Sequence, residues 1–538
     1  FIGDQMKKIK TSTYVIAIMF LVMLVFGLNI SQHHLFSSDN TWSQITRFYD
    51  VLKIVRSYYV EEVDTEKLIT GAIEGMLEEL DPHSVYIEPK KLKEISEQFQ
   101  GSYEGIGIEF IIQNKVITVV SPIAGSPSEA VGLRPGDQIV KISGKSAYGI
   151  TETDVQKKLK GPKGTEVTVT VRRPGLKDPF DVTIVRDRIP IYSVMASFMI
   201  TPKIGYINVG RFAHTTVDEF DKAFSELEKE GMKALLLDLR GNSGGLLDQA
   251  FKLADRFVDG RKKIVFTKGR IPESNSEFYA SSFVTKARLP LVILIDKGSA
   301  SASEIVAGAV QDWDRGLIVG ETSFGKGLVQ TQISLKDGSA LRITTARYYT
   351  PSGRLIQRSY EEGLLEYYAS AYNDDDQVEG EQDSEDSEKP VFFTDAGRKV
   401  YGGGGISPDV HIKHQTISRF SANLIFKRLF FEFASKYCAR HPELKGDFNG
   451  FKQNFQADKA ILVEFRQFVE SSDMEFKEQD FKKDLEYIKL MIKSEIARNL
   501  WGSSEYYHIR IINDHQVQEA LKSFDRAAQI AGITFAGS

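Results

Sequence analysis

The sequence predicts an α+β protein of several domains, because three patterns of apolar residues follow one another along its 538 residues. Helical spacing marks residues 41–98 and 416–538, and short alternating strands fill residues 99–190. Residues 191–415 carry near-continuous apolar runs of strand length between helical stretches, which is typical of an α/β layer. A chain that is 42% hydrophobic and 26% charged can fill roughly three or four globular domains of this kind.

We expect residues 1–40 to be an export signal or a membrane anchor. Lys7, Lys8 and Lys10 precede the apolar run of residues 14–28, which is the order of charged and apolar segments in such a signal. No small-x-small cleavage site follows the run, so an uncleaved anchor in the inner membrane and a removed signal both stay open. In both cases the expected location is the periplasm or cell envelope.

Helical periodicity from Thr41 to about Gln98 predicts a helical N-terminal region. Its second helix is expected to end before Asp81, because Pro82 disfavours helical backbone in the residue that precedes it. We interpret His83, next to this proline, as a residue that makes a cap or turn hydrogen bond.

Short strands bounded by turns predict a compact β domain over residues 99–190. The expected strands are residues 106–112, 116–120, 138–142, 165–172 and 180–185, with a helix at 126–131. The arrangement resembles a PDZ domain, and Gly105-Ile106-Gly107-Ile108 matches its carboxylate-binding loop. A loop with glycine can direct successive backbone N–H groups at a terminal carboxylate, while the following strand pairs with the peptide. The alternative is a PDZ-like structural module that binds no peptide.

Apolar runs at residues 234–237, 291–295 and 317–319 predict buried strands of a largely parallel sheet. Helices are expected at residues 217–228, 246–257 and 303–312. Nine carboxylates and no Lys or Arg between Asp374 and Glu388 predict a disordered, solvated insertion at about residues 373–390. The helical C-terminal domain that follows shows no chemical motif.

Two short segments offer a nucleophile and a base without any histidine. The first is Gly298-Ser-Ala-Ser301-Ala-Ser-Glu304, and the second is Gly325-Lys326-Gly327. A serine hydroxyl is a poor nucleophile until a partner takes its proton, and a lysine can do so if burial keeps its amine neutral. Lowering a lysine pKa from about 10.4 to near 7 means destabilising the charged form by roughly 4 to 5 kcal/mol. The pair therefore indicates a hydrolase whose lysine is enclosed by other elements.

Three simpler interpretations stay open for these segments. The small residues after Gly298 also suit the capped start of a helix. Residues 320–327 follow the spacing of a phosphate-binding loop, but Gly327 stands where that loop needs Ser or Thr to hold magnesium. Lys326 also suits an ordinary solvated loop.

Charge and cysteine content exclude other classes of protein. A formal net charge of −5 gives no basic footprint, so we expect no nucleic-acid partner. The single cysteine, Cys438, excludes an internal disulfide framework and a multi-cysteine zinc site. We expect neither a metal nor another cofactor.

Together with the expected anchor and the PDZ-like insert, these motifs resemble the carboxy-terminal processing proteases, a family of Ser/Lys peptidases. The resemblance implies that Ser301 is the nucleophile, that Lys326 is its base and that Gln330 orients the lysine amine. It also implies an oxyanion hole formed by the backbone N–H groups of Gly245 and Ala302.

The same resemblance spans roughly residues 41–410 and implies a PDZ domain at 99–190 and a protease core at 191–415. The expected activity is that of a serine endopeptidase, which captures polypeptides by exposed C-termini that end in apolar or small residues and cleaves them through an acyl-enzyme. The resemblance leaves the oligomeric state open, a homo-oligomer included. The alternative function is a catalytically silent PDZ scaffold or adaptor of the envelope, although the presence of Ser301, Lys326 and Gln330 argues against it.

Overall fold

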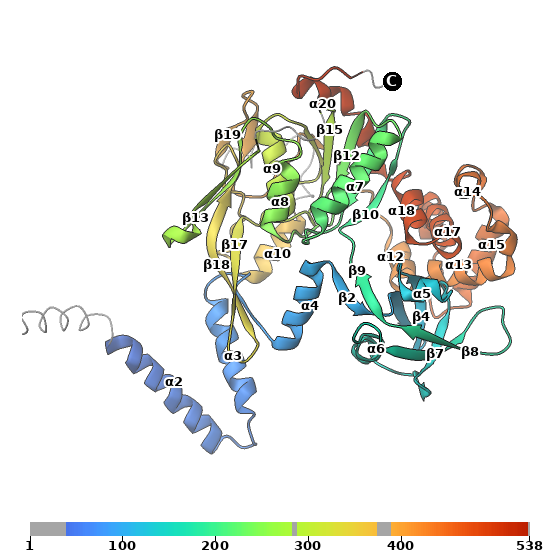
Figure 1. Ribbon diagram of the computed structural model, residues 1–538, viewed down its shortest axis with the longest axis horizontal. Coiled ribbons are helices and arrows are strands. Elements are labelled where there is room, and N and C mark those ends of the chain that lie inside the picture. Colours follow the sequence, from blue (N-terminus) through green and yellow to red (C-terminus); the bar gives the residue numbers. More distant parts are fainter. Residues whose placement is uncertain (1–38, 282–287, 374–388, 536–538) are drawn as a thin grey trace, which may run out of the picture. The chain divides into compact units, whose positions relative to one another are not determined.

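The computed structural model describes residues 39–281, 288–373 and 389–535, in two compact units that divide the chain between Leu80 and Asp81 (Figure 1). The expected signal or anchor lies almost wholly outside these residues, and so does the acidic stretch 374–388. Over the described ranges, no helix combines the length and the apolar content needed to cross a membrane.

The described part of the first unit is helical, as the periodicity predicts, with α2 (Asp39–Tyr58) and α3 (Thr65–Glu78). Asp64 caps α3, because its carboxylate accepts hydrogen bonds from the backbone N–H groups of Glu66 and Lys67.

The second unit begins with the turn Asp81–Ser84, the strand β1 (Val85–Ile87) and the helix α4 (Pro89–Gln100). The sequence predicts the end of the second helix before Asp81, and helix again up to about Gln98. The segment Val85–Ile87 is instead the strand β1, which pairs antiparallel with a strand of the core, β18 (Ala340–Tyr349). Pro89 suits the first turn of α4, where its missing N–H would have no helical partner. Gly101, with φ 70°, ends the helix.

The β domain expected after α4 is present. Its elements are β2 (Ser102–Gly105), β3 (Ile108–Gln113), β4 (Val116–Pro122), α5 (Pro127–Ala130), β5 (Gln138–Ile142), β6 (Lys145–Ser146), α6 (Glu152–Leu159), β7 (Glu166–Arg172), β8 (Phe180–Val185) and β9 (Asp187–Pro190). The main sheet has the order β3-β4-β5-β7-β8, and β2 pairs with β9. Buried aliphatic side chains of these strands and of α6 form one core.

The α/β layer contains the largely parallel sheet that the sequence predicts. Its elements are β10 (Val194–Met199), β11 (Ile204–Val209), α7 (Thr216–Lys229), β12 (Ala234–Asp238), α8 (Leu247–Ala254), β15 (Leu291–Ile295), α9 (Ala302–Asp312), β16 (Leu317–Gly320) and β21 (Val410–His411). The strand order is β10-β11-β12-β15-β16-β21, and every neighbouring pair is parallel except β10 with β11. Every residue of β12 and β15 is buried, which explains their uninterrupted apolar sequences.

A second sheet stands beside this layer and was not predicted. It consists of β13 (Lys263–Gly269), β14 (Ser276–Tyr279), β17 (Leu328–Ser334), β18 and β1. Only Leu328 of β17 is fully buried, so this strand carries no apolar run that a sequence pattern could reveal. The same region contains α10 (Leu364–Asn373), β19 (Val391–Phe393) and β20 (Lys399–Tyr401).

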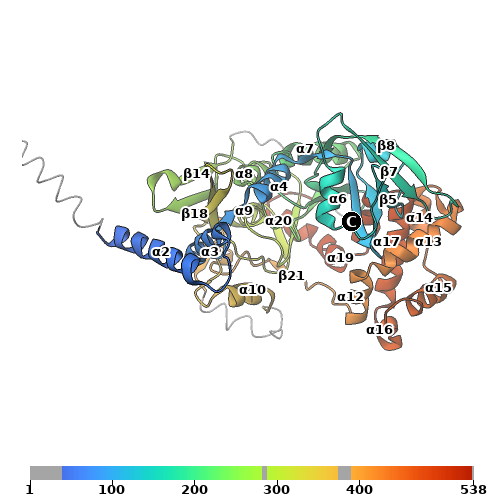
Figure 2. The same ribbon diagram turned by 90° about the horizontal axis from the view of Figure 1, so that it is seen from below.

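The C-terminal region is helical, as predicted. Its helices are α12 (Arg419–Phe426), α13 (Leu429–Arg440), α14 (Phe448–Asn454), α15 (Lys459–Glu470), α16 (Glu478–Lys483), α17 (Leu485–Leu500), α18 (Ser503–Ile511), α19 (His515–Leu521) and α20 (Phe524–Ile530). Most of them enclose a core of their own. The helices α19 and α20 instead pack Val517, Ala520, Phe524 and Ala527 against the α/β sheet, at the position seen for α20 in Figures 1 and 2. The helices α19 and α20 are therefore part of the core of the α/β layer.

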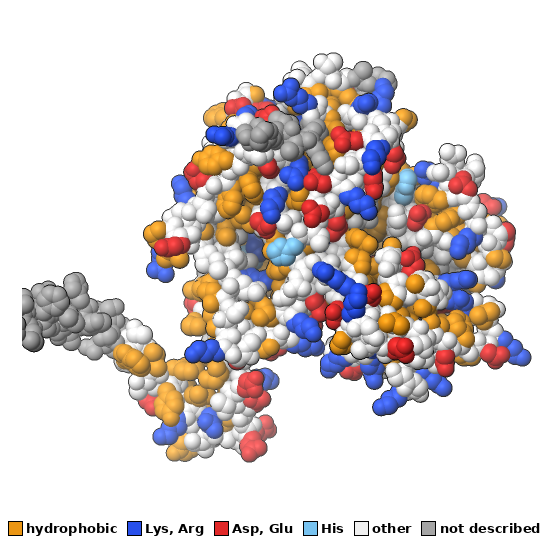
Figure 3. Space-filling model, viewed as in Figure 1, with side chains coloured by type: hydrophobic (Ala, Val, Ile, Leu, Met, Phe, Trp, Pro, Cys, Tyr) orange, Lys and Arg blue, Asp and Glu red, His pale blue; other side chains and the backbone are white. Residues whose placement is uncertain are grey.

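Acidic and basic side chains are interspersed on the face shown in Figure 3, and neither sign forms a continuous field there. A mixed surface of this kind does not concentrate a potential that would steer a polyanion.

Candidate active site

Ser301 lies on the sharp turn between β15 and α9. Its backbone has φ 54° and ψ −108°, and such a left-handed conformation costs a residue other than glycine on the order of 1–3 kcal/mol. In α/β-hydrolases the nucleophilic serine sits on a strained strand-to-helix turn that exposes its hydroxyl. The two neighbouring serines are buried and make structural hydrogen bonds: Ser299 donates to the carbonyl of Leu239 at 2.9 Å and Ser303 to that of Asn242 at 2.8 Å.

Four of the five residues predicted for catalysis line one cavity of about 800 Å³, namely Ser301, Lys326, Gln330 and Gly245. The cavity lies among the turn after β12, the start of α9 and the strands β17 and β18. The fifth, Ala302, is buried as the first residue of α9.

Two shared partners hold Ser301 and Lys326 beside one another. The Oε2 atom of Glu304 accepts the backbone N–H of Ser301 at 2.7 Å and that of Lys326 at 2.9 Å. The hydroxyl of Tyr348 faces both carbonyl oxygens, at 3.1 Å from that of Ser301 and 2.7 Å from that of Lys326. The backbones of the two residues are thus fixed relative to each other from both sides.

The surroundings of Lys326 favour its neutral form. Burial lowers the pKa of its ammonium group, and the positive charge of Arg342 lowers it further, while the carboxylates of Asp81 and Glu304 act in the opposite direction. The Nζ atom donates to Oε1 of Gln330 at 3.1 Å. The interpretation of Lys326 as an ordinary solvated lysine does not fit this burial.

Glu304 was quoted in the sequence motif but given no role. Its side chain is fully buried, and its two oxygens accept four hydrogen bonds: from Ser301 and Lys326, from the hydroxyl of Ser323 at 2.6 Å and from the N–H of Gly325 at 2.7 Å. Burial raises the pKa of this carboxyl, and the hydrogen bonds counteract that rise. A Ser-x-x-Glu capping box is the signal by which the sequence could have identified it.

Gly245 and Ala302 lie where two turns approach each other. A Cβ added to the neighbouring Gly244 would stand 2.9 Å from Cβ of Ser301 and 3.0 Å from the backbone N of Ala302, so only glycine fits. Ala302 begins α9, and the first N–H groups of a helix have no acceptor within it. Gly245 has φ 144°, and its Cβ would stand 2.1 Å from the carbonyl oxygen of Phe212.

Asn242, which the sequence analysis missed, joins these two turns. Its fully buried side chain donates to the carbonyl of Val209 at 2.7 Å and accepts the N–H of Gly244 at 2.9 Å. Its carbonyl accepts the N–H of Ala300 at 3.0 Å and the hydroxyl of Ser303 at 2.8 Å. The turn that carries Gly245 is therefore tied directly to the turn that carries Ser301.

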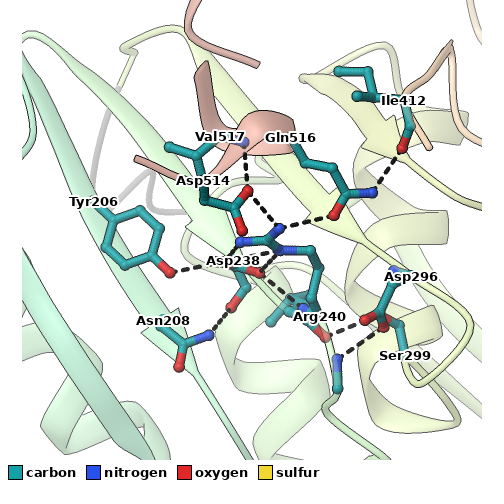
Figure 4. Close-up of polar contacts among 12 residues, drawn as sticks. Tyr206, Asn208, Asp238, Arg240, Asp296, Ser299, Ile412, Asp514, Gln516 and Val517 are labelled. Atoms are coloured by element: carbon teal, nitrogen blue, oxygen red, sulfur yellow. Dashed lines mark hydrogen bonds and ion pairs between the residues drawn. The ribbon is translucent and has the colours of Figure 1, made fainter. Parts of the chain in front are cut away.

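Arg240 connects the same turn to the C-terminal domain (Figure 4). Its guanidinium group binds the carboxylate of Asp238 at 2.7 Å, that of Asp514 at 2.9 Å and Oε1 of Gln516 at 2.8 Å. Asp238 also accepts the hydroxyl of Tyr206 at 2.7 Å. Asp514 and Gln516 stand at the start of α19, about 270 residues away in the chain, so no local pattern could have predicted this cluster.

The loop predicted to bind a carboxylate lines a second cavity of about 450 Å³ through Ile106, Gly107 and Ile108. The carbonyl of Ile106 accepts both N–H and hydroxyl of Ser128, and the carbonyl of Gly107 accepts the hydroxyl of Ser126 at 2.9 Å. In a trans peptide unit the N–H points opposite to the carbonyl, so the N–H groups of Gly107 and Ile108 point away from α5. Gly105 ends β2 and does not line this cavity.

The phosphate-loop interpretation fails on the element that follows the loop. A phosphate loop directs its N–H groups from the start of a helix. Residues 321–327 instead lead into the strand β17.

Family models match four parts of the chain. Peptidase family S41 matches residues 203–363, and a PDZ domain matches 118–173. The N-terminal domain of the activating protease CtpB matches 27–91, and a family of unknown function matches 420–502.

The chain is also similar to individual proteins. A carboxy-terminal-processing protease of Bartonella bacilliformis is 42% identical over 325 residues, which are 60% of this chain and 74% of that protein. The carboxy-terminal processing protease CtpB of Bacillus subtilis is 38% identical over 325 residues, 60% of this chain and 66% of its own. Among solved structures, a photosystem II D1 C-terminal processing protease is 28% identical with a TM-score of 0.35, covering 68% of this chain and 92% of its own.

Proposed function

Because the chain belongs to peptidase family S41, as a carboxy-terminal processing serine peptidase with a PDZ domain, we propose that Ser301 and Lys326 form its catalytic dyad. The observation that carries this proposal is the cavity shared by a serine on a strained turn and a lysine whose pKa burial lowers.

In the proposed mechanism, neutral Lys326 takes the proton of the Ser301 hydroxyl as its oxygen attacks the scissile carbonyl. The ammonium group then gives a proton to the leaving amine, and water hydrolyses the acyl-enzyme by the same route. Gln330 accepts an N–H of the amine at 3.1 Å, which leaves the nitrogen lone pair for the serine proton.

The N–H groups of Gly245 and Ala302 are proposed to stabilise the oxyanion of the tetrahedral intermediates. One such donor contributes about 2.7–4 kcal/mol to catalysis in other hydrolases. The hydrogen bonds of Asn242 support this role, because they fix the two turns that carry the donors.

We propose that the PDZ domain binds the free C-terminus of a polypeptide in the cavity beside Gly107 and Ile108. Gln98 and Arg211 line both this cavity and the one at Ser301. A chain held at its end in the first cavity can therefore continue into the second. A location in the cell envelope, with residues 1–40 as signal or anchor, remains our proposal from the sequence.

The test compares the full chain with Ser301→Ala on β-casein as an unstructured substrate. Cleavage is expected to stop in Ser301→Ala and to continue at the full rate in Ser197→Ala, a matched change of an exposed serine on β10. Cleavage by Ser301→Ala at the full rate would refute the dyad.

Recognition of C-termini is tested separately with a fluorescent peptide that has an apolar end and either a free or an amidated C-terminus. Only the free carboxylate is expected to bind, and equal binding of both forms would contradict the PDZ role. A chain that binds the peptide but cleaves nothing would match the alternative, a catalytically silent scaffold.

A further inference from the structure

The turn Asp81–Ser84 contacts the side chain that holds the Lys326 amine. The backbone carbonyl of His83 accepts a hydrogen bond from Nε2 of Gln330. In the other direction, Oε1 of the same amide accepts from Nζ of Lys326 at 3.1 Å. Gln330 thus stands between the turn and the lysine, with one end of its amide on each.

The carbonyl of His83 determines which way the Gln330 amide faces. A carbonyl oxygen can only accept, so the amide must present its NH₂ group to His83 and its oxygen to Lys326. The pairing of β17 with β18 shifts register at Gln330, because Val329 pairs with Ala346 and Gln330 with Thr344, which leaves Thr345 as an extra residue on β18. Such a bulge increases the local twist of the strand pair. The hydrogen bond from the turn sets the orientation of the amide.

Hydrogen bonds within the turn, to β18 and to Tyr367 hold it in place. The Oδ1 atom of Asp81 accepts the N–H groups of His83 at 2.8 Å and of Ser84 at 3.0 Å, and Oδ2 accepts the Ser84 hydroxyl at 2.7 Å. Ser84 Oγ in turn accepts the N–H of Thr344 on β18 at 3.1 Å. The His83 ring lies 2.8 Å from the hydroxyl of Tyr367, which is buried.

We propose that the Asp81–Ser84 turn is a positioning element for catalysis, which acts through Gln330 to aim the lone pair of the Lys326 amine at Ser301. This inference rests on the proposed dyad and adds to it the residues that set the direction of proton transfer. An amine that gives one N–H to a fixed oxygen has fewer orientations, and its lone pair stays available to the serine.

The charges around Lys326 give the turn a second effect. Asp81 lies on the turn, Glu304 on α9 and Arg342 on β18, and the two carboxylates raise the pKa of Lys326 while Arg342 lowers it. His83 does not add a positive charge near neutral pH, because burial and Lys326 lower its pKa to about 4. Removing the charge of Asp81 therefore lowers the pKa of Lys326 further.

The test is a double-mutant cycle of Asp81→Ala and Gln330→Ala in the full chain, with a quenched-fluorescent peptide that has an apolar C-terminus. We measure kcat on the alkaline plateau, where Lys326 is neutral in every variant. Because a positioned acid or base contributes about 10²- to 10⁴-fold, each single change is expected to lower kcat by about 10- to 100-fold with KM unchanged. If the turn acts through Gln330, the double variant should be less than about threefold slower than Gln330→Ala alone.

Effects that multiply in the double variant, or an Asp81→Ala rate within threefold of the parent, would overturn the proposal. Asp337→Ala is the matched control, because Asp337 accepts the N–H and hydroxyl of Ser339 in the β17–β18 hairpin without touching Gln330. If Asp81→Ala fails to fold, Ser84→Ala replaces it in the same cycle with the same criterion.

A pH profile separates the charge of Asp81 from its place in the turn. Asp81→Asn keeps the size of the side chain but removes its charge, so the acid limb of kcat is expected to move to lower pH. An acid limb at the same or a higher pH would contradict the effect of Asp81 on the pKa of Lys326. Ser301→Ala is measured in the same series. If it retains activity, the proposed dyad is wrong. If it is inactive but the effects of Asp81→Ala and Gln330→Ala on kcat multiply, only the role of the turn is refuted.

Discussion

Gly245→Ala tests the proposed oxyanion hole most directly. A Cβ at this position would stand 2.1 Å from the carbonyl oxygen of Phe212 and 2.8 Å from its carbonyl carbon, both backbone atoms. The turn must shift by about 0.9 Å to reach even a tight contact of 3.0 Å, and a misplacement of about 1 Å in an active site can cost about 100-fold. Complete loss of one oxyanion donor costs about 10²- to 10³-fold in kcat, or about 2.7–4 kcal/mol. We therefore expect kcat to fall by about 100- to 1000-fold with little change in KM.

Gly241→Ala is the matched control for this substitution. Gly241 belongs to the same turn and also has a positive φ, 65°, but a Cβ there meets no atom within 4 Å. It is expected to lower stability by about 1–2 kcal/mol through left-handed backbone strain and to leave kcat nearly unchanged. The assays are steady-state cleavage of a quenched-fluorescent peptide and thermal unfolding of both variants. Equal losses of kcat in the two variants, or a Gly245→Ala rate within threefold of the parent, would refute the placement of the donor.

Three further predictions concern neighbouring residues. Arg342→Gln removes a positive charge that lowers the pKa of Lys326, so the amine becomes neutral only at higher pH. In a pH–rate profile the acid limb of kcat should therefore move to higher pH, and a move to lower pH would contradict the assignment. Glu304→Gln exchanges an oxygen that accepts two hydrogen bonds for an NH₂ group. Each buried donor left without a partner costs about 1–3 kcal/mol, and urea unfolding should detect this loss of stability. Peptide cleavage should show a fall in kcat of at least about tenfold. Asp514→Asn weakens the hydrogen bond that holds Arg240 and should lower kcat several-fold. An effect confined to KM would speak against a link from the C-terminal domain to the turn that carries Gly245.

The sequence predicts best where local pattern and burial coincide. The strands β5, β8 and β15 have the bounds expected for them, because their apolar residues alternate or run together within one short segment. The second sheet was missed, since β17 and β18 show neither an uninterrupted nor a regularly alternating apolar pattern, and β18 also pairs with the distant strands β1 and β13. The strand β1 was expected to be helical, because its three residues are too few to show a strand pattern.

The candidate site divides in a similar way. Lys326 stood out because it lies between two glycines, whereas Ser301 was separated from Ser299 and Ser303 only by the resemblance to the protease family. Asn242 and Arg240 were missed, because their importance depends on which distant groups they meet after folding. The only local sequence pattern that indicates a role for Glu304 is its position three residues after Ser301, as in a capping box.

The backbone conformation of Ser301 also bears on how such a protein can change under selection. Glycine adopts φ near 54° at little steric cost, so selection for thermostability alone would favour Ser301→Gly. Retention of serine there therefore limits the free energy of unfolding that the chain can reach while it keeps its proposed nucleophile. Variants selected only for survival at high temperature are expected to lose this serine early, and random libraries should be screened for activity in parallel.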